Sequence, residues 1–213
     1  MPETYPVVET FDSIQGEGVY AGAPASFARL WGCPTPRCDF CDTPYAWDKP
    51  RHEAKEMSPG QLASELPLPH VVITGGEPFL YDLVPLLEQL CDARKVVEIE
   101  TSGKLPHRLP RLSFMWWPHI TLSPKAAVDY TFHPSFKRIV GAVKYVITED
   151  FDFAKVLETN PEPKEWGVPV FFQPCWYPEQ ERRNAALSKT YDLLHTYPSC
   201  RLSIQLHKIL KIR

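Results

Sequence analysis

Apolar residues in this chain gather in short runs that are separated by stretches with helical spacing. Strands are expected at residues 25–31, 70–74, 95–101, 120–122, 142–148, 168–173 and 201–206. Between these runs, apolar side chains recur every three or four residues, as they do from Leu83 to Leu90. Strands that alternate with helices are typical of parallel βαβ units. We therefore expect one α/β domain over residues 1–213, an open, partial β/α barrel with about six parallel strands rather than the eight of a closed barrel.

Two of the expected helices carry further local signals. Ser58, Pro59 and Gln61 match a capping box with proline at the first helical position, so a helix should begin there. The longest helix is expected over residues 178–197, and helical spacing places Leu187, Tyr191 and Leu194 on one face.

Polar motifs follow five of the expected strands. They are Gly75-Gly76-Glu77-Pro78, Glu100-Thr101-Ser102, Ser123-Pro124-Lys125, Gln173-Pro174 and Gln205-Leu206-His207. Because ligands bind at the carboxyl ends of parallel strands, we expect these motifs to converge on one face. Arg29 interrupts the apolar run 25–31, and such a cation is either paired at a sheet edge or directed into a ligand cavity.

Composition narrows the classes of function. Of 213 residues, 44% are hydrophobic and 23% are charged, with a net charge of −3, which argues against a broad electrostatic surface for nucleic acid or anionic membrane. The first residues lack the basic and apolar regions of a signal peptide, and no apolar run approaches the roughly 18 residues of a membrane span. We therefore expect a cytoplasmic protein, with neither nucleic acid nor membrane as a direct partner.

Three of the six cysteines lie close together in the loop 32–43, which contains Cys33, Cys38 and Cys41. In the cytosol such clusters bind metal more often than they form disulfides. A structural zinc ion normally has four protein ligands, and His52 is the nearest candidate for the fourth. A 4Fe-4S cluster held by three thiolates keeps one iron open for a small molecule. The cysteines alone support zinc and iron–sulfur about equally.

Two neighbouring features favour the iron–sulfur interpretation. Gly75-Gly76-Glu77-Pro78 follows an expected strand, where exposed backbone groups could bind the polar end of a ligand. Phe40 directly precedes the last cysteine of the loop, where its ring could cover a base. Taken alone, the glycine pair reads as an ordinary tight turn. Its occurrence together with the cysteine loop is the informative observation.

This combination resembles the radical S-adenosylmethionine superfamily. The resemblance implies that Cys33, Cys38 and Cys41 hold one 4Fe-4S cluster per subunit, and that Gly75, Gly76 and Glu77 receive the amino end of S-adenosyl-L-methionine. An electron from the cluster would then cleave the cofactor to a 5′-deoxyadenosyl radical, which abstracts hydrogen from the substrate. The cofactor carries the difficult chemistry, and the protein positions it.

Further motifs resemble the 7-carboxy-7-deazaguanine synthase family. They are Ser13-Ile14-Gln15-Gly16-Glu17-Gly18, Arg29-Leu30-Trp31-Gly32-Cys33, Cys41-Asp42-Thr43, Ser123-Pro124-Lys125, Gln173-Pro174 and Gln205-Leu206-His207-Lys208. The resemblance spans residues 9–208. It implies ring contraction of 6-carboxy-5,6,7,8-tetrahydropterin with loss of ammonia, in queuosine and 7-deazapurine biosynthesis.

The same resemblance assigns further site residues. The implied substrate contacts are Ile14, Gln15, Gly16, Glu17, Arg29, Thr74 and His207. The implied cofactor contacts, besides the glycine motif, are Phe40, Asp42, Ser123, Lys125 and Gln173. Thr43 would be a ligand of a Mg2+ ion that bridges to the substrate; Mg2+ prefers hard oxygen ligands and keeps few from protein. An electron donor such as a flavodoxin or ferredoxin and a second copy of the chain, forming a homodimer, are the implied partners.

Two alternatives remain at this point. An activase that installs a glycyl radical on a partner enzyme shares the cysteine loop but leaves Gln15-Gly16-Glu17-Gly18 and His207 without a role. A zinc-binding interaction module belongs to another class, and the alternating strands and helices argue against it. The spacing of Cys33 and Cys38 departs from the commonest superfamily pattern, in which three residues separate the first two cysteines; here there are four. Pro34 and Pro36 indicate a loop that can accommodate the extra residue.

Overall fold

One curved sheet of nine strands forms the centre of the computed structural model, which describes residues 4–107, 109, 117–160 and 165–213. The strand order is β3-β1-β2-β4-β5-β6-β7-β8-β9. The bounds are β1 Tyr5–Ile14, β2 Pro24–Leu30, β3 Lys55–Met57, β4 His70–Gly75, β5 Val96–Thr101, β6 His119–Leu122, β7 Val140–Ile147, β8 Val170–Pro174 and β9 Arg201–Leu202. All pairings from β2 to β9 are parallel, while β1 pairs antiparallel with β2 and β3. The expected open, mostly parallel α/β sheet is confirmed.

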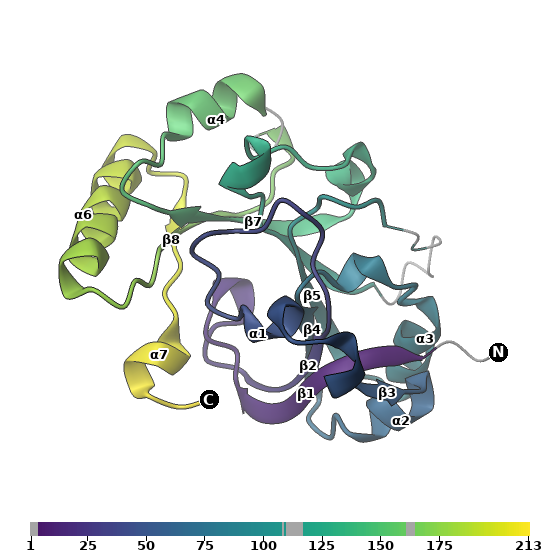
Figure 1. Cartoon of the computed structure of the whole chain (residues 1–213). Helices are drawn as coiled ribbons and strands as arrows, with labels where there is room; N and C mark the ends of the chain where they lie inside the picture. The colour runs from purple at the N-terminus through teal and green to yellow at the C-terminus, as the bar shows by residue number, and fades with distance from the viewer. Residues whose placement is uncertain (1–3, 108, 110–116, 161–164) are drawn as a thin grey trace.

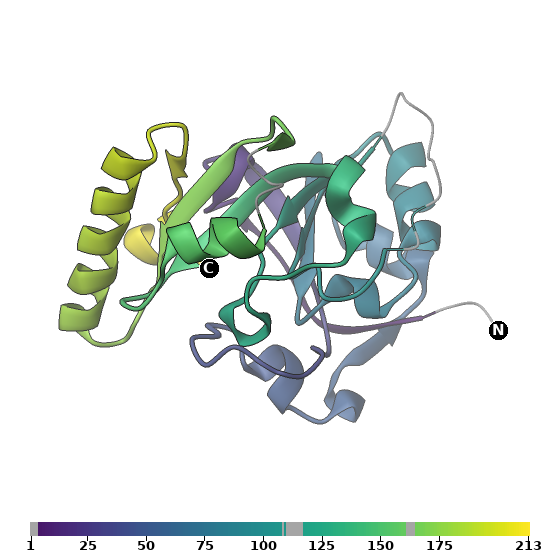
Figure 2. The same ribbon diagram turned by 90° about the horizontal axis from the view of Figure 1, so that it is seen from above.

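Helices cover the outer side of this sheet. The α-helices are α1 Tyr45–Asp48, α2 Pro59–Ser64, α3 Val84–Asp92, α4 Phe153–Thr159, α6 Gln180–Thr196 and α7 Leu206–Leu210. Short 3-10 helices occupy Gly18–Tyr20, Arg51–Glu53, Pro78–Leu80, Ala126–Val128 and Pro134–Arg138. In Figure 1, α2, α3, α4 and α6 surround the strands, while α1 and the loop before it cross the open front. Figure 2 shows α6 outside β7 and β8, which it contacts.

Alternation along the strands gives the sheet two different faces. Odd-numbered residues of β4 and β5, such as Val71, Ile73 and Ile99, are fully buried in the main core beneath the helices. The alternate side chains point to the inner face. Val72 packs there with Ala25 and Phe27 in a small apolar cluster. Polar residues make up much of the rest of this face, and several are buried; they include Thr74, Glu98, Glu100, Thr121, Lys144 and Gln173. Because side chains alternate with a period of two, each strand supplies both the core and a polar interior.

The start of α2 is as expected. The Ser58 side chain accepts a hydrogen bond from the Gln61 backbone, and the Gln61 side chain accepts one from the Ser58 backbone. This capping box satisfies two backbone donors that would otherwise lack partners.

One expectation about the last third of the chain is wrong. The strand expected at residues 201–206 ends at Leu202. The Ser203 backbone still donates to the Phe172 carbonyl of β8, while its buried hydroxyl donates to Gln173 and accepts from Gly18. The motif at 205–207 therefore begins helix α7 instead of ending a strand.

The residues expected on one face of α6 differ in burial. Leu194 packs against the core, whereas Leu187 is 50% exposed and Tyr191 is 63% exposed. The fully buried residues of this helix are Ala186 and Thr190.

None of the helices in the part of the chain that the structure describes is long and apolar enough to cross a membrane.

Candidate active site

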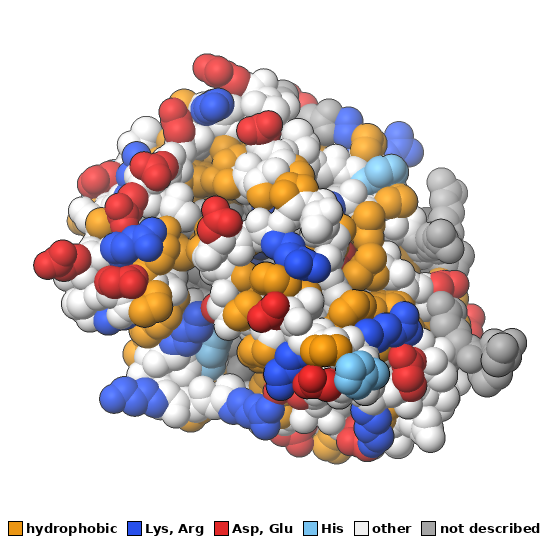
Figure 3. Space-filling view, in the orientation of Figure 1, with side chains coloured by type: hydrophobic (Ala, Val, Ile, Leu, Met, Phe, Trp, Pro, Cys, Tyr) orange, Lys and Arg blue, Asp and Glu red, His pale blue; other side chains and the backbone are white. Residues whose placement is uncertain are grey.

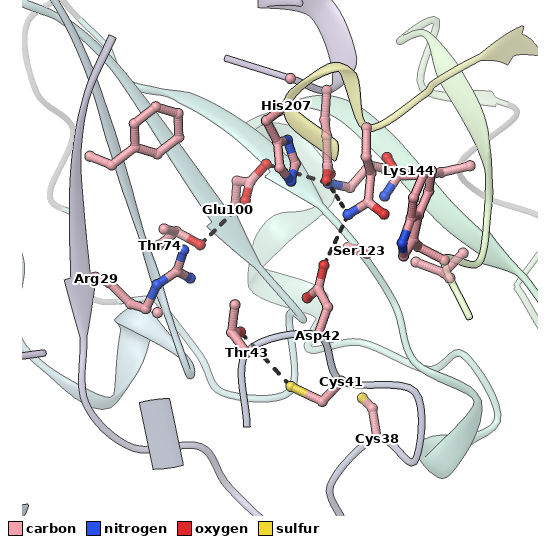
Figure 4. Close-up of a pocket in the computed structure, with 18 of the residues that line it drawn as sticks. Arg29, Cys38, Cys41, Asp42, Thr43, Thr74, Glu100, Ser123, Lys144 and His207 are labelled. Atoms are coloured by element: carbon pink, nitrogen blue, oxygen red, sulfur yellow. Dashed lines mark hydrogen bonds and ion pairs between the residues drawn. The ribbon is translucent and has the colours of Figure 1, made fainter. Parts of the chain in front are cut away.

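A cavity of about 420 Å³ opens on the carboxyl ends of the parallel strands. All five polar motifs contribute to its lining, four from strand ends and the fifth from the start of α7, so their expected convergence is confirmed. Figure 3 shows a hollow in this face, between α7 and α1, with basic and histidine side chains at its rim. Figure 4 shows the interior: Cys38, Cys41, Asp42 and Thr43 lie on one side, and His207 and Lys144 face them.

The cysteine loop is fastened to the glycine motif after β4. The Glu77 backbone donates to the Gly32 carbonyl at 2.7 Å, and the Gly76 backbone donates to the Leu30 carbonyl at 3.1 Å. A Cβ atom at Gly76 would lie 1.8 Å from the Gly32 carbonyl oxygen, closer than any real contact. Position 76 must therefore be glycine for the cysteine loop to rest on this turn.

The Glu77 side chain has a structural role. It is completely buried, and its carboxylate accepts hydrogen bonds from the Thr101 hydroxyl at 2.6 Å and from the Ser102 backbone at 2.9 Å. Glu77 is the one predicted cofactor residue that does not line the cavity. Its side chain instead ties the end of β4 to the end of β5, and its main chain donates to Gly32 and accepts from Leu80.

Cys33, Cys38 and Cys41 all have free thiols, and all line the cavity. The indole N–H of Trp47 donates to the Cys41 sulfur at 3.4 Å. Burial, followed by the nearby Glu77 carboxylate, raises the pKa of Cys33 to about 11. Among the described residues, no three His, Cys, Asp or Glu side chains are placed to hold one metal ion.

Asp42 and Thr43 follow the last cysteine of the loop. Burial alone would raise the pKa of Asp42, but Lys208 lowers it to about 2 through its charge and a 2.6 Å hydrogen bond. Gln205 also donates to Asp42, at 3.0 Å. The Thr43 hydroxyl lines the cavity and lies 3.9 Å from the Cys41 sulfur. Helix α7 thus holds the far end of the cysteine loop.

Lys144 lies between two carboxylates on the wall opposite the cysteine loop. Its ammonium group donates to Glu17 and, at 3.3 Å, to Glu100; its side chain is only 7% exposed. Burial would lower the pKa of Lys144, but the charges of Glu100 and Glu17 raise it above its ordinary value. Burial likewise favours neutral Glu17, and the charge of Lys144 outweighs it and lowers the Glu17 pKa. Lys144 and Glu17 are therefore both charged at neutral pH.

Arg29 is held by Glu9. Its Nε donates to the Glu9 carboxylate at 2.8 Å, and the Tyr45 hydroxyl donates to the same oxygen at 2.9 Å. Arg213 donates to the other Glu9 oxygen. Figure 4 shows the Arg29 guanidinium directed toward Thr74, within the cavity. Among the described residues no partner is found for its terminal nitrogens, so Arg29 offers a planar pair of donors to an anion.

His207 closes the cavity from α7. A Cβ atom at Gly16 would lie 2.3 Å from the His207 Nδ1 atom, so the ring packs directly on the loop after β1. Burial lowers the pKa of His207, and the opposing charge of Glu17 does not restore it. The ring is therefore neutral near pH 7 and offers one donor and one acceptor.

Every predicted site residue except Glu77 lines this cavity. The lining also contains charged residues that the sequence interpretation missed, namely Glu9, Lys104, Lys144, Lys208 and Arg213. Lys144 carried a usable signal, because it interrupts an apolar strand in the same way as Arg29. No signal in the sequence pointed to Arg213, because only the fold brings it beside Glu9.

Comparison with known proteins agrees with this geometry. Residues 32–155 match the radical SAM superfamily. The 7-carboxy-7-deazaguanine synthase of Synechocystis sp. is 36% identical over 216 residues, covering 99% of this chain and 94% of that protein. The 7-carboxy-7-deazaguanine synthase of Pyrobaculum aerophilum is 46% identical over 199 residues, covering 87% and 86%. The crystal structure of QueE from Escherichia coli superposes with a TM-score of 0.73 at 26% identity, covering 96% and 95%.

The fold and the cysteine loop thus define a radical SAM enzyme. Within that superfamily, this chain belongs to the 7-carboxy-7-deazaguanine synthase family.

Proposed function

We propose that this protein converts 6-carboxy-5,6,7,8-tetrahydropterin to 7-carboxy-7-deazaguanine with release of ammonia, a carbon–nitrogen lyase reaction of queuosine and 7-deazapurine biosynthesis. Family membership supports this reaction. One observation carries it further. The three free cysteines share a cavity with Arg29, whose terminal nitrogens have no partner among the described residues, and with the buried ion pair of Lys144 and Glu17. Product and ammonia together contain every atom of the substrate, so the ring contraction needs no net oxidant.

The residues present fit a 4Fe-4S cluster. Three free thiols line one cavity, and the Trp47 indole N–H donates to the Cys41 sulfur. When bound, the cluster and S-adenosyl-L-methionine supply the radical chemistry. We expect Cys38→Ala to lose most of its iron after anaerobic reconstitution, measured by iron analysis and electron paramagnetic resonance. Cys91→Ala, on α3 outside the cavity, is the matched control and should retain iron.

The cavity offers distinct groups to the cofactor and the substrate. Gly75 and Gly76, Ser123 and Lys125 lie at strand ends near the cysteine loop, where they suit the polar ends of S-adenosyl-L-methionine. Arg29 suits the substrate carboxylate, because its fork matches the two carboxylate oxygens. Glu17 and Glu100 accept hydrogen bonds, as the amino and ring N–H groups of a pterin require.

A Mg2+ ion on Thr43 is the finer part of this proposal. Thr43 faces the cavity beside the cysteine loop, and one hydroxyl completed by substrate and water suits the oxygen preference of Mg2+. Turnover should fall when Mg2+ is chelated, and Thr43→Ala should turn over slowly and respond weakly to added Mg2+. Unchanged turnover of Thr43→Ala with no Mg2+ dependence in either protein would rule out this ion.

We also propose that a flavodoxin or ferredoxin supplies the electron in the cytoplasm, where the six free thiols stay reduced. A homodimer is supported by exposed apolar side chains on β9 and α7: Leu202, Ile209 and Leu210 are 48%, 53% and 56% exposed. Light scattering coupled to size exclusion should give twice the chain mass, and Ile209→Glu should give the mass of one chain.

The decisive experiment combines reconstituted protein, dithionite, S-adenosyl-L-methionine and 6-carboxy-5,6,7,8-tetrahydropterin without oxygen. Mass spectrometry should detect 7-carboxy-7-deazaguanine, and ammonia should appear in equal amount. Cofactor cleavage without this product would contradict the proposed substrate. Protein that takes up zinc and no iron during reconstitution would contradict the reaction class.

A further inference from the structure

A second acid, Glu98, lies beneath the cavity and is not part of its lining. It precedes Glu100 by two residues on β5, so both side chains leave the same face of the strand, with Glu98 one step deeper. The Glu98 side chain is 1% exposed. Burying a carboxylate costs several kcal/mol unless partners compensate. The contacts of Glu98 should therefore explain why an acid is buried at this position.

The partners of Glu98 connect it to the loop after β1. One carboxylate oxygen accepts a hydrogen bond from the Gln15 amide at 2.7 Å, and the other accepts from the Thr121 hydroxyl at 2.7 Å. Gln15 itself is 3% exposed. The other end of its amide accepts from the Glu17 backbone at 3.2 Å. The Gln15 side chain is therefore a link between Glu98 below and Glu17 above.

The main chain of Gln15 is engaged as well. Its N–H donates to the Ala23 carbonyl, and its carbonyl accepts from Gly22, each at 2.7 Å. These bonds close the loop 15–23. Since Glu17 also binds Lys144 and Gln205, the position of this loop sets the position of the acid that faces the substrate.

Charged and titratable groups surround Glu98 from each neighbouring element. His70 on β4 lies 3.8 Å away, and its Nε2 has no hydrogen-bond partner among the described residues. Glu100 on the same strand and Lys144 on β7 act on it electrostatically. The Tyr20 ring lies tilted against His70 and edge-on to His119, and burial, followed by the charge of Glu98, raises the pKa of Tyr20. Among the described residues, none of these groups donates a hydrogen bond to Glu98 in place of the Gln15 amide.

We propose that Glu98 is a positioning residue for the substrate site, which holds the Gln15 amide and thereby fixes the Gln15–Glu17 segment against the cavity. Glu98 touches neither substrate nor cofactor. This inference rests on the proposed function for its catalytic consequences, but the loop geometry that it predicts can be measured without turnover.

Glu98→Leu tests the proposal, with Glu98→Gln as the conservative variant and Glu88→Gln, an exposed acid on α3, as the control. A glutamine at 98 can still accept from Gln15, whereas leucine cannot. We expect Glu98→Leu to weaken substrate binding by about 10- to 100-fold, because a displaced site residue costs up to this much. Iron content and cofactor cleavage without substrate should stay within about twofold. Glu98→Gln and Glu88→Gln should match the parent protein.

A double-mutant cycle with Gln15 provides the second part of the test. Gln15→Met removes the same link from its other end, so the double variant should bind substrate no more weakly than the weaker single variant. Additive losses would overturn the proposal, as would a normal substrate affinity in Glu98→Leu. If Glu98→Leu does not fold, Gln15→Met keeps the test, because loss of the same link should speed exchange of the Glu17 amide; unchanged exchange in Gln15→Met would overturn the proposal.

Amide hydrogen exchange tests the positioning role of Glu98 independently of the reaction that the protein catalyses. The Glu17 and Gly22 amides should exchange about tenfold faster in Glu98→Leu, while amides in α3 should not change. Faster exchange in a protein that makes no deazaguanine product would support the positioning role and contradict only the reaction. Unchanged exchange of these two amides would overturn the positioning role whatever the reaction.

Discussion

The Lys144 ammonium and the Glu17 carboxylate form an ion pair inside the cavity although 127 positions separate them in the chain. Their side chains are 7% and 12% exposed, and Glu100 completes the group. A buried pair of this kind is weak as a source of stability, but removing one partner leaves an unpaired charge.

Lys144→Met should therefore destabilise the protein by about 3 to 5 kcal/mol, because Glu17 and Glu100 lose their counter-charge. Anaerobic urea unfolding of reconstituted protein measures the change. Lys155→Met, on an exposed face of α4, should change stability by no more than about 0.5 kcal/mol. A loss below about 1 kcal/mol at position 144 would mean that the carboxylates are better solvated than their burial indicates.

The turn after β4 should tolerate no side chain at position 76. Gly76→Ala would place a methyl group on the Gly32 carbonyl, so the cysteine loop must shift and iron should be lost after reconstitution. Iron content and the visible absorption of the cluster measure this. Gly60→Ala is the matched control, since its Cβ would meet only Gln89, at 3.9 Å, and alanine in α2 should stabilise by up to about 1 kcal/mol. Full iron content in Gly76→Ala would show that the two loops can separate.

Replacing Arg29 by lysine should separate carboxylate recognition from cofactor chemistry. Lysine keeps the charge but loses both the Nε contact with Glu9 and the planar pair of terminal donors. Binding of 6-carboxy-5,6,7,8-tetrahydropterin should weaken by about 10- to 100-fold. Equilibrium binding of tetrahydropterin without the carboxyl group is the comparison, and it should hardly change. Equal weakening for both ligands would place the carboxylate elsewhere.

Burial, followed by the charge of Glu100, raises the pKa of Glu98 from 4.5 to about 7. The folded protein thus favours protonated Glu98, and this favourable contribution is complete below pH 4.5 and is lost as pH rises to 7. Relative to the parent, Glu98→Gln should therefore gain stability with rising pH over this window, by up to about 3 kcal/mol. Unfolding by urea at several pH values measures the difference. A gain that does not vary with pH would show that Glu98 titrates normally.

Sequence reasoning was most successful where one motif carries the chemistry locally. The cysteine loop, the glycine motif and the strand ends required only the rule that parallel strands present their carboxyl ends together. The class of fold followed from the same alternation of strands and helices.

Sequence reasoning failed for contacts between residues that lie far apart in the chain. Leu187 and Tyr191 lie at helical spacing, yet both are exposed, while Ala186 and Thr190 of α6 are buried. Glu98 and Lys144 interrupt apolar strands, and their partners come from the loop after β1 and from β5. Glu77 belongs to a cofactor motif, but only the structure reveals that its carboxylate accepts hydrogen bonds from Thr101 and Ser102 instead.

Gln205 donates to Glu17 from the loop after β1 and to Asp42 from the cysteine loop. One amide thereby joins two segments that lie far apart in the chain, and Lys208 of helix α7, which begins directly after Gln205, adds a second contact to Asp42. A movement of helix α7 would therefore disturb the cysteine loop and the Glu17 wall together, so the two sides of the cavity depend on one short helix for their spacing.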